Sequence, residues 1–198
     1  MNLQKNKQDS HSHSHINDHE HTAHKHCTGC HKHEHEEKAD LIKEVKIAVC
    51  IISDSRTYAT DETGQMLIEK ISQTDSFVKS DYTLIKNDEN EINRVLDNFL
   101  KSESIVLITS GGTGLSSKDI TIDTISRKYT KTLSGFGEIF RLLSYEEIGV
   151  RAMMSRAAAG VISDKLIISL PGSKNAVKLA YEKIIAPQLK HIIYEITR

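Results

Sequence analysis

The sequence predicts an α/β domain built on a three-layer, open and mostly parallel sheet with helices on both faces. Segments rich in β-branched and apolar residues alternate along the chain with segments whose apolar residues recur every three or four positions. The apolar segments are nearly continuous, as in strands that are buried on both faces of a parallel sheet. The stretch 41–198 is long enough for one such domain with a sizeable core.

The first half of this stretch shows the pattern most clearly. Val45–Ile52 (VKIAVCII) is an apolar run that predicts a buried strand, in which Cys50 is expected to be a small core residue. Asn87 or Asp88 is a plausible cap for a helix that carries its apolar residues on one face. The expected order is a strand at 45–52, a turn at 53–56, a helix within 63–71, a short strand at 81–85, a helix from 87–89 onward and a strand at 105–108.

The second half is expected to be more helical. Lys165–Leu170 (KLIISL) predicts a further buried strand, and Pro187 predicts a kink or break in the last helix. The expected elements are helical stretches around 120–129, 135–143 and 152–160, the strand at 165–170, and a long helical stretch at 174–194.

The segments that follow the expected strands should meet at one edge of the sheet. In open α/β sheets, ligands bind beyond the carboxyl ends of parallel strands. Short polar or glycine-rich segments follow the strands at all four such points. The segments expected at this edge are Ser53-Asp54, Asn87-Asp88, Thr109–Gly114 and Pro171-Gly172-Ser173.

The glycine-rich segment is the most informative of these. It reads Thr109, Ser110, Gly111, Gly112, Thr113, Gly114, and it lies between an apolar strand and a helix-compatible stretch. Glycines in a strand-to-helix turn bring bare backbone N–H groups and a positive helix end to an anion, which predicts a phosphate site. An ordinary tight turn between a strand and a helix is the alternative.

Two acids stand where they could hold Mg²⁺ beside bound phosphates. Asp88 and Asp119 each follow an expected strand on the site edge, and Mg²⁺ prefers carboxylate and phosphate oxygens. Each acid also precedes an expected helix, so helix capping is the alternative for both. Arg156 has a similar pair of interpretations, because it could contact a phosphate or form a surface ion pair.

Residues 1–40 are expected to be a disordered tail. Ten of the 11 histidines lie within 11–35, among Ser, Glu and Lys, with few apolar residues to offset the entropy of ordering. Imidazole and thiolate are ligands for Zn²⁺, Ni²⁺ and copper, and His26, Cys27, Cys30 and His31 could close one site. The alternatives are a purification tag and a native tail that binds metal only weakly.

Composition bounds the partners and the compartment. The chain has 26 basic and 27 acidic residues and no basic cluster, so no nucleic-acid partner is expected. No continuous apolar segment suggests a signal peptide or a membrane span. With three cysteines and no disulfide framework, a reducing cytoplasm is the expected location.

Several motifs in order resemble one family. TSGGTG at 109–114, GFGEIFR at 135–141, LSYEEIG at 143–149 and LPGS at 170–173 are similar to the MoaB/MogA family of molybdenum-cofactor biosynthesis. The similarity runs from about residue 45 to about residue 195 and is greatest to the MoaB branch.

The resemblance implies a molybdopterin adenylyltransferase that uses MgATP and releases pyrophosphate. It implies that Asp88 and Asp119 are the functional acids. Ser134, Gly135 and Glu138 would lie beside the pterin, although the residues alone also fit an ordinary helix start. Pro171, Gly172 and Ser173 would bind the rest of the ligand, or form a simple strand-ending turn. A homotrimer or homohexamer is implied, and other cofactor-assembly proteins are possible partners.

The chain departs from the family pattern at Lys118, where Arg is common, at Asp123, where Pro is common, and at Lys174. Lys118 keeps the charge of Arg but lacks its two-pronged geometry. Two other functions also stay open. One is a carrier that binds molybdopterin without catalysis, and the other is a metal-delivery protein that acts through the tail.

Overall fold

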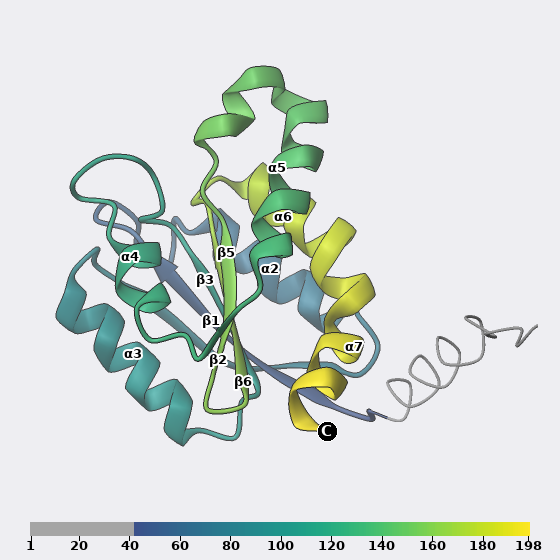
Figure 1. Cartoon of the computed structure of the whole chain (residues 1–198). Coiled ribbons are helices and arrows are strands. Elements are labelled where there is room, and N and C mark those ends of the chain that lie inside the picture. Colours follow the sequence, from purple (N-terminus) through teal and green to yellow (C-terminus); the bar gives the residue numbers. More distant parts are fainter. Residues whose placement is uncertain (1–41) are drawn as a thin grey trace, which may run out of the picture.

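Six strands form one sheet, in the order β2-β1-β3-β6-β5-β4, in the computed structural model, which describes residues 42–198 (Figure 1). β1, β2, β3 and β6 run parallel, and β5 and β4 are added antiparallel at one side. The prediction of a mostly parallel α/β sheet is confirmed. The strands are β1 Val45–Ile52, β2 Phe77–Ile85, β3 Val106–Ser110, β4 Lys131–Thr132, β5 Ala158–Ile162 and β6 Lys165–Leu170.

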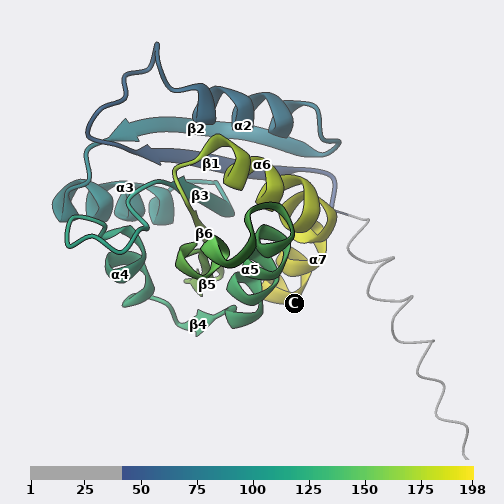
Figure 2. The same ribbon diagram turned by 90° about the horizontal axis from the view of Figure 1, so that it is seen from above.

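Helices cover both faces of this sheet, as Figure 2 shows from above. The helices on one face pack on a core that includes Leu67, Phe140 and Leu189, and those on the other face pack on a core that includes Leu96 and Ile125. The first group is α2 Glu62–Ser72, α5 Ser134–Ile148, α6 Lys174–Ala180 and α7 Ala186–Thr197, and the second is α3 Glu89–Lys101 and α4 Thr121–Ser126.

β1 explains why its sequence is apolar throughout. Ile47 and Ile51 face the larger core, whereas Ala48 and Cys50 face the smaller one. Alternate residues of a strand point to opposite faces, so a strand covered on both faces needs apolar residues at every position. Cys50 is 1% exposed and lies in the core as predicted, and burial raises the pKa of its thiol to about 12.

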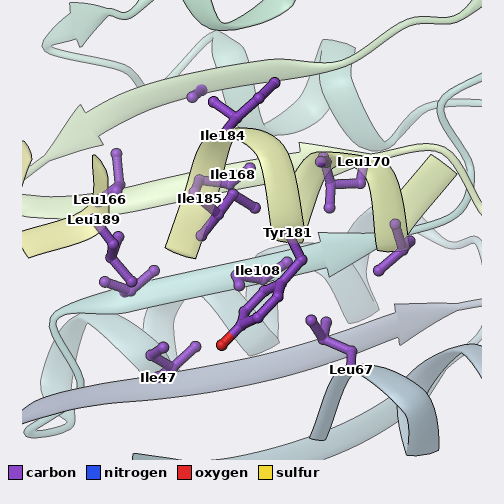
Figure 3. Packing of buried hydrophobic residues seen from close by; sticks show 14 of the residues in the cluster. Ile47, Leu67, Ile108, Leu166, Ile168, Leu170, Tyr181, Ile184, Ile185 and Leu189 are labelled. Carbon is purple, nitrogen blue, oxygen red and sulfur yellow. The ribbon is translucent and has the colours of Figure 1, made fainter. Parts of the chain in front are cut away.

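The break predicted at Pro187 is present as a π-helical turn, Tyr181–Ile185 (η2), between α6 and α7. The backbone N–H of Ala186 bonds to the carbonyl oxygen of Tyr181, five residues earlier. Pro187 has no N–H to continue the regular ladder, which accounts for the irregular turn just before it. Figure 3 shows that the turn packs Tyr181, Ile184 and Ile185 toward the strands.

The helix predicted around 152–160 is wrong. A short 3₁₀ helix, Gly149–Met154 (η1), is followed by the strand β5, whose backbone pairs with β6. Alanine favours helices, but pairing with the neighbouring strand overrides that propensity here. β5 and β4 were both missed from the sequence, and α5 is longer than expected and projects with η1 beyond the sheet (Figure 1).

The expected tail, 1–40, lies outside the described residues, as do its candidate metal ligands His26, Cys27, Cys30 and His31.

Candidate functional site

The segments after the four parallel strands meet at the carboxyl edge of the sheet, as the strand order predicts. The backbone N–H of Gly111 donates to the carbonyl oxygen of Leu170 at 3.0 Å, which joins the β3 loop to the end of β6. The N–H of Ser53 donates to the carbonyl oxygen of Ile85 at 2.9 Å, which joins the ends of β1 and β2. The segments after β1, β2, β3 and β6, which are far apart in the sequence, therefore lie at the same edge of the sheet.

A cavity of about 510 Å³ opens at this edge. The walls come from the loops after β1, β3 and β6 and from the end of η1. The predicted site residues among its lining are Ser53, Gly111, Gly112, Thr113, Gly114, Asp119, Pro171, Gly172 and Ser173. The other lining residues are Ile52, Ser55, Arg56, Met154, Ser155 and Arg156.

Glycine is required at two positions of the loop. Gly111 and Gly112 have φ of 107° and 61°, which side chains rarely adopt. A Cβ on Gly111 would lie 2.1 Å from the carbonyl oxygen of Ile52, and one on Gly112 would lie 2.4 Å from Thr121 Oγ1. The loop therefore needs both backbone freedom and the absence of side chains, and it presents backbone to the cavity.

Thr109 and Ser110 lie beneath the cavity and are not among its lining residues. The hydroxyl of Thr109 donates to Ser169 Oγ at 3.0 Å, and that of Ser110 donates to the carbonyl oxygen of Pro171 at 3.0 Å. Both residues are buried. They hold the β3 loop against β6 and so support the shape of the cavity.

Asp119 is half-buried and lines the cavity. Its Oδ2 accepts from the N–H of Ser116 at 3.1 Å, so the acid folds its own loop. It does not cap α4, whose N-cap is Ile120 without a side-chain cap bond. Of the two interpretations weighed from sequence, helix capping does not apply to Asp119.

Asp88 behaves differently. It is the N-cap of α3, and its Oδ1 accepts from the N–H groups of Asn90 and Glu91 at 2.9 and 3.0 Å. It is exposed and lies outside the lining of the cavity. Capping is therefore what Asp88 does in this structure. Asp54, also outside the lining, accepts the N–H of Asn87 at 3.1 Å on its Oδ1.

Arg56 is a cavity residue that the sequence did not single out. Its Nη1 lies 3.2 Å from Asp61 Oδ1, and its Nη2 donates to the carbonyl oxygen of Gly172 at 2.9 Å. Asp61 is buried and also accepts from the Tyr82 hydroxyl at 2.5 Å. Desolvation by burial is the main reason that the pKa of Tyr82 is raised, and the hydrogen bond to Asp61 raises it further. The only sequence signal was an arginine in the turn after β1.

Arg156 forms the ion pair that was one of its two interpretations, and contact with a phosphate stays a prediction. Its Nη2 pairs with Asp123 Oδ1 at 2.7 Å, and its Nη1 donates to the carbonyl oxygen of Gly114 at 3.0 Å while the side chain lines the cavity. The hydrogen bond from Arg156 lowers the pKa of Asp123. Two guanidinium groups, of Arg56 and Arg156, thus border the glycine-rich loop.

Ser134, Gly135 and Glu138 lie in the first turns of α5 and are not among the cavity lining. α5 follows β4, and β6 and β5 lie between β4 and β3 in the sheet. The structure therefore does not bring these three residues together with the loop after β3.

None of the helices within residues 42–198 combines the length and the hydropathy that a membrane-spanning helix needs. The same part of the chain holds no group of three or more His, Cys, Asp or Glu residues that could bind a metal ion.

Comparison with known proteins agrees with this architecture. Residues 48–191 match the family described as "Probable molybdopterin binding domain". Molybdenum cofactor biosynthesis protein B of Staphylococcus aureus is 45% identical over 165 residues, covering 82% of this chain and 98% of that protein.

Two solved structures are also similar. A crystal structure of molybdenum cofactor biosynthesis protein B is 41% identical with a TM-score of 0.75, covering 78% of this chain and 96% of that one. The tungsten cofactor synthesizing protein MoaB from Pyrococcus furiosus is 36% identical with a TM-score of 0.71, covering 79% and 99%. On the sequence match, the shared fold and the placement of its loops, the chain belongs to the MoaB/MogA family of molybdenum-cofactor biosynthesis proteins.

Proposed function

We propose that this chain acts in molybdenum-cofactor biosynthesis by adenylylating molybdopterin with MgATP. An oxygen of the molybdopterin terminal phosphate attacks the α-phosphorus of ATP and forms a new P–O bond. The bond from the α-phosphorus to the bridging oxygen breaks, and pyrophosphate leaves with the electron pair. Such phosphorus chemistry depends mainly on positioning and charge neutralisation.

The observation that carries this proposal is the composition of the cavity wall. Backbone of Gly111–Gly114 faces a space bordered by the guanidinium groups of Arg56 and Arg156 and by the carboxylate of Asp119. Backbone N–H groups and guanidinium forks bind phosphate, and a volume of about 510 Å³ is within the range of small-ligand sites. The wall is therefore suited to a phosphorylated ligand.

The donor set also fits Mg²⁺. Mg²⁺ in phosphate-transfer sites is held by one or two carboxylates and by substrate oxygens, so a three-acid cluster is not needed. Asp119, in the cavity wall, would be the first such carboxylate, and Asp88, on the same edge, the second. When bound, Mg²⁺ would supply charge neutralisation at the phosphates. Arg56 and Arg156 would orient the phosphate oxygens through their N–H groups.

Pyrophosphate release from ATP, with purified molybdopterin and Mg²⁺, tests the proposal directly. We expect release by the wild type and a loss of at least about 100-fold in Asp119→Asn, which keeps the shape of the side chain and removes its charge. Asp97→Asn, on the exposed face of α3, is the matched control and should keep full activity. A wild-type rate in Asp119→Asn would refute the assignment.

A carrier function has one observation in its favour. Asp88 uses its carboxylate to cap α3 and does not line the cavity. A chain with one acid in the cavity could bind molybdopterin without transferring an adenylyl group. Tight pterin binding without pyrophosphate release would establish this function in place of the first.

Two further proposals concern the assembly and the tail. The chain is proposed to form a homotrimer or homohexamer, for which the exposed apolar residues of α5 and η1 provide a contact surface. Residues 1–40 are proposed to bind Zn²⁺, Ni²⁺ or copper, with His26, Cys27, Cys30 and His31 as ligands, because of their composition.

A further inference from the structure

Asn87 joins the two segments that carry the proposed functional acids. It immediately precedes Asp88, and its side-chain Nδ2 donates to the backbone carbonyl oxygen of Lys118, which immediately precedes Asp119. Its own backbone N–H donates to Asp54 Oδ1 at 3.1 Å. Asn87, in the segment after β2, is thus bonded both to the loop after β1 and to the loop after β3.

The contact with Lys118 anchors an otherwise self-contained segment. The other hydrogen bonds of residues 115–119 connect members of that segment, such as Ser116 to Asp119 in both directions. Among the residues that the structure describes, Asn87 alone bonds to this segment from outside it. The hydrogen bond from Asn87 therefore ties the segment that carries the Asp119 carboxylate to the end of β2.

The surroundings of the Asn87 amide argue against a role in stability alone. In the described chain its Oδ1 is buried without a hydrogen-bond partner, as is Thr121 Oγ1. Both oxygens lie against Gly112, where a Cβ would come within 2.6 and 2.4 Å of them. A buried oxygen without a partner costs free energy, so an apolar side chain of the same shape would fit this place at least as well.

We propose that Asn87 is a positioning residue that fixes the Asp119 loop relative to the segment that carries Asp88, and so holds the Asp119 carboxylate at the phosphate site. The proposal rests on the proposed adenylylation and adds a residue that touches neither substrate. A misplacement of about 1 Å in a reacting geometry can lower a rate by about 100-fold, so one hydrogen bond at this point is enough to matter.

Asn87→Leu separates position from stability. Leucine has nearly the shape of asparagine but cannot donate to the Lys118 carbonyl, and it removes the unpartnered oxygen. We expect a thermal unfolding midpoint at or above that of the wild type, a kcat at least about 10-fold lower, and KM values for ATP and molybdopterin within about threefold. Asn98→Leu, at an exposed position of α3, is the matched control and should leave kcat unchanged.

Hydrogen exchange provides a readout that does not depend on activity. We expect the amides of residues 115–119 to exchange at least about 10-fold faster in Asn87→Leu than in the wild type, and not in Asn98→Leu. Unchanged exchange in these amides would overturn the proposal, and so would faster exchange with an unchanged kcat.

If the wild type releases no pyrophosphate, the proposed adenylylation fails, and the exchange rates still decide whether Asn87 holds the loop. If Asn87→Leu does not fold, Asn87→Ala serves in the same two measurements.

Discussion

Arg56 shows how a single side chain can serve both stability and a ligand site. Its guanidinium faces the cavity while it pairs with Asp61, whose side chain is 0% exposed. Arg56→Ala would leave that buried carboxylate without its charged partner, and we expect a loss of about 3 kcal/mol in the free energy of unfolding. Arg156→Ala should cost about 1 kcal/mol or less, because its partner Asp123 is 57% exposed. Urea denaturation of the two variants measures both losses. Equal losses of unfolding free energy would contradict the prediction.

Cys50 makes stability depend on pH in the alkaline range. Burial raises the pKa of its thiol from 9.0 to about 12, so above pH 9 the unfolded chain releases a proton that the folded chain retains. This stabilisation is complete below the unfolded pKa and is lost as pH rises, with a slope approaching about 1.4 kcal/mol per pH unit.

We expect Cys50→Ala to flatten the decline in unfolding free energy between roughly pH 8.5 and 9.5, below the range in which the tyrosines titrate. The slope is the readout, because the substitution also leaves a small cavity that lowers stability at every pH. The same slope in both proteins would show that Cys50 is not responsible.

What the sequence could predict at this scale depended on how local the cause was. Gly111 and Gly112 could be identified from the sequence because glycines directly after a strand predict a tight turn or a phosphate-binding loop. Arg56 was not, since its partner Gly172 lies 116 residues further along the chain. Asn87 was considered as a helix cap together with Asp88, and Asp88 takes the cap while Asn87 bonds across two loops.

At the scale of elements, patterns that repeat over many residues gave correct predictions. β1, β6, α2 and α3 lie close to where their periodicity placed them. β5 was missed because its first residues, Ala158, Ala159 and Gly160, have no strand pattern of their own, and their conformation comes from pairing with β6. β4, with two residues, is too short to leave a periodic signal.

Small side chains in β5 have a packing reason that can be tested. A Cβ on Gly160 would lie 2.4 Å from the ring of Tyr129, so Gly160→Ala should force the ring to move and lower the free energy of unfolding by about 1–3 kcal/mol. Gly135→Ala, in the first turn of α5, meets no atom within 4 Å and should be neutral or slightly stabilising. Thermal unfolding of the two variants distinguishes the cases. Gly160→Ala with wild-type stability would show that Tyr129 has room to move.

At the scale of the whole molecule, α5 and η1 carry several large apolar side chains that are exposed to solvent. Leu142 is 62% exposed, Val150 72% and Met153 81%, and these elements project beyond the sheet (Figure 1). Several exposed large apolar side chains on two neighbouring elements are typical of a protein–protein contact. Met154, at the end of η1, lines the cavity, so an assembly through this surface would border the site.

We expect the wild type to have the mass of a trimer or hexamer by light scattering, and Leu142→Glu with Met153→Glu to reduce it toward the monomer, because burying two carboxylates in an apolar contact is costly. Val78→Glu makes the same chemical change on the edge strand β2 and should not alter the mass. A monomeric wild type, or an unchanged mass in the double variant, would exclude this surface as the contact.

The functions of the histidine-rich tail and of the domain can be tested separately by measuring Zn²⁺ uptake and pyrophosphate release on the same variants. Thiolates are the strongest Zn²⁺ ligands in the tail, so Cys27→Ser with Cys30→Ser should reduce Zn²⁺ uptake below one ion per chain, and removal of residues 1–40 should abolish it. If adenylylation belongs to the domain, pyrophosphate release should survive both changes, because the cavity and its two arginines lie within 42–198. Loss of release together with uptake would mean that the tail takes part in the reaction. Unchanged uptake after truncation would place the metal elsewhere and remove the basis for a metal-delivery function.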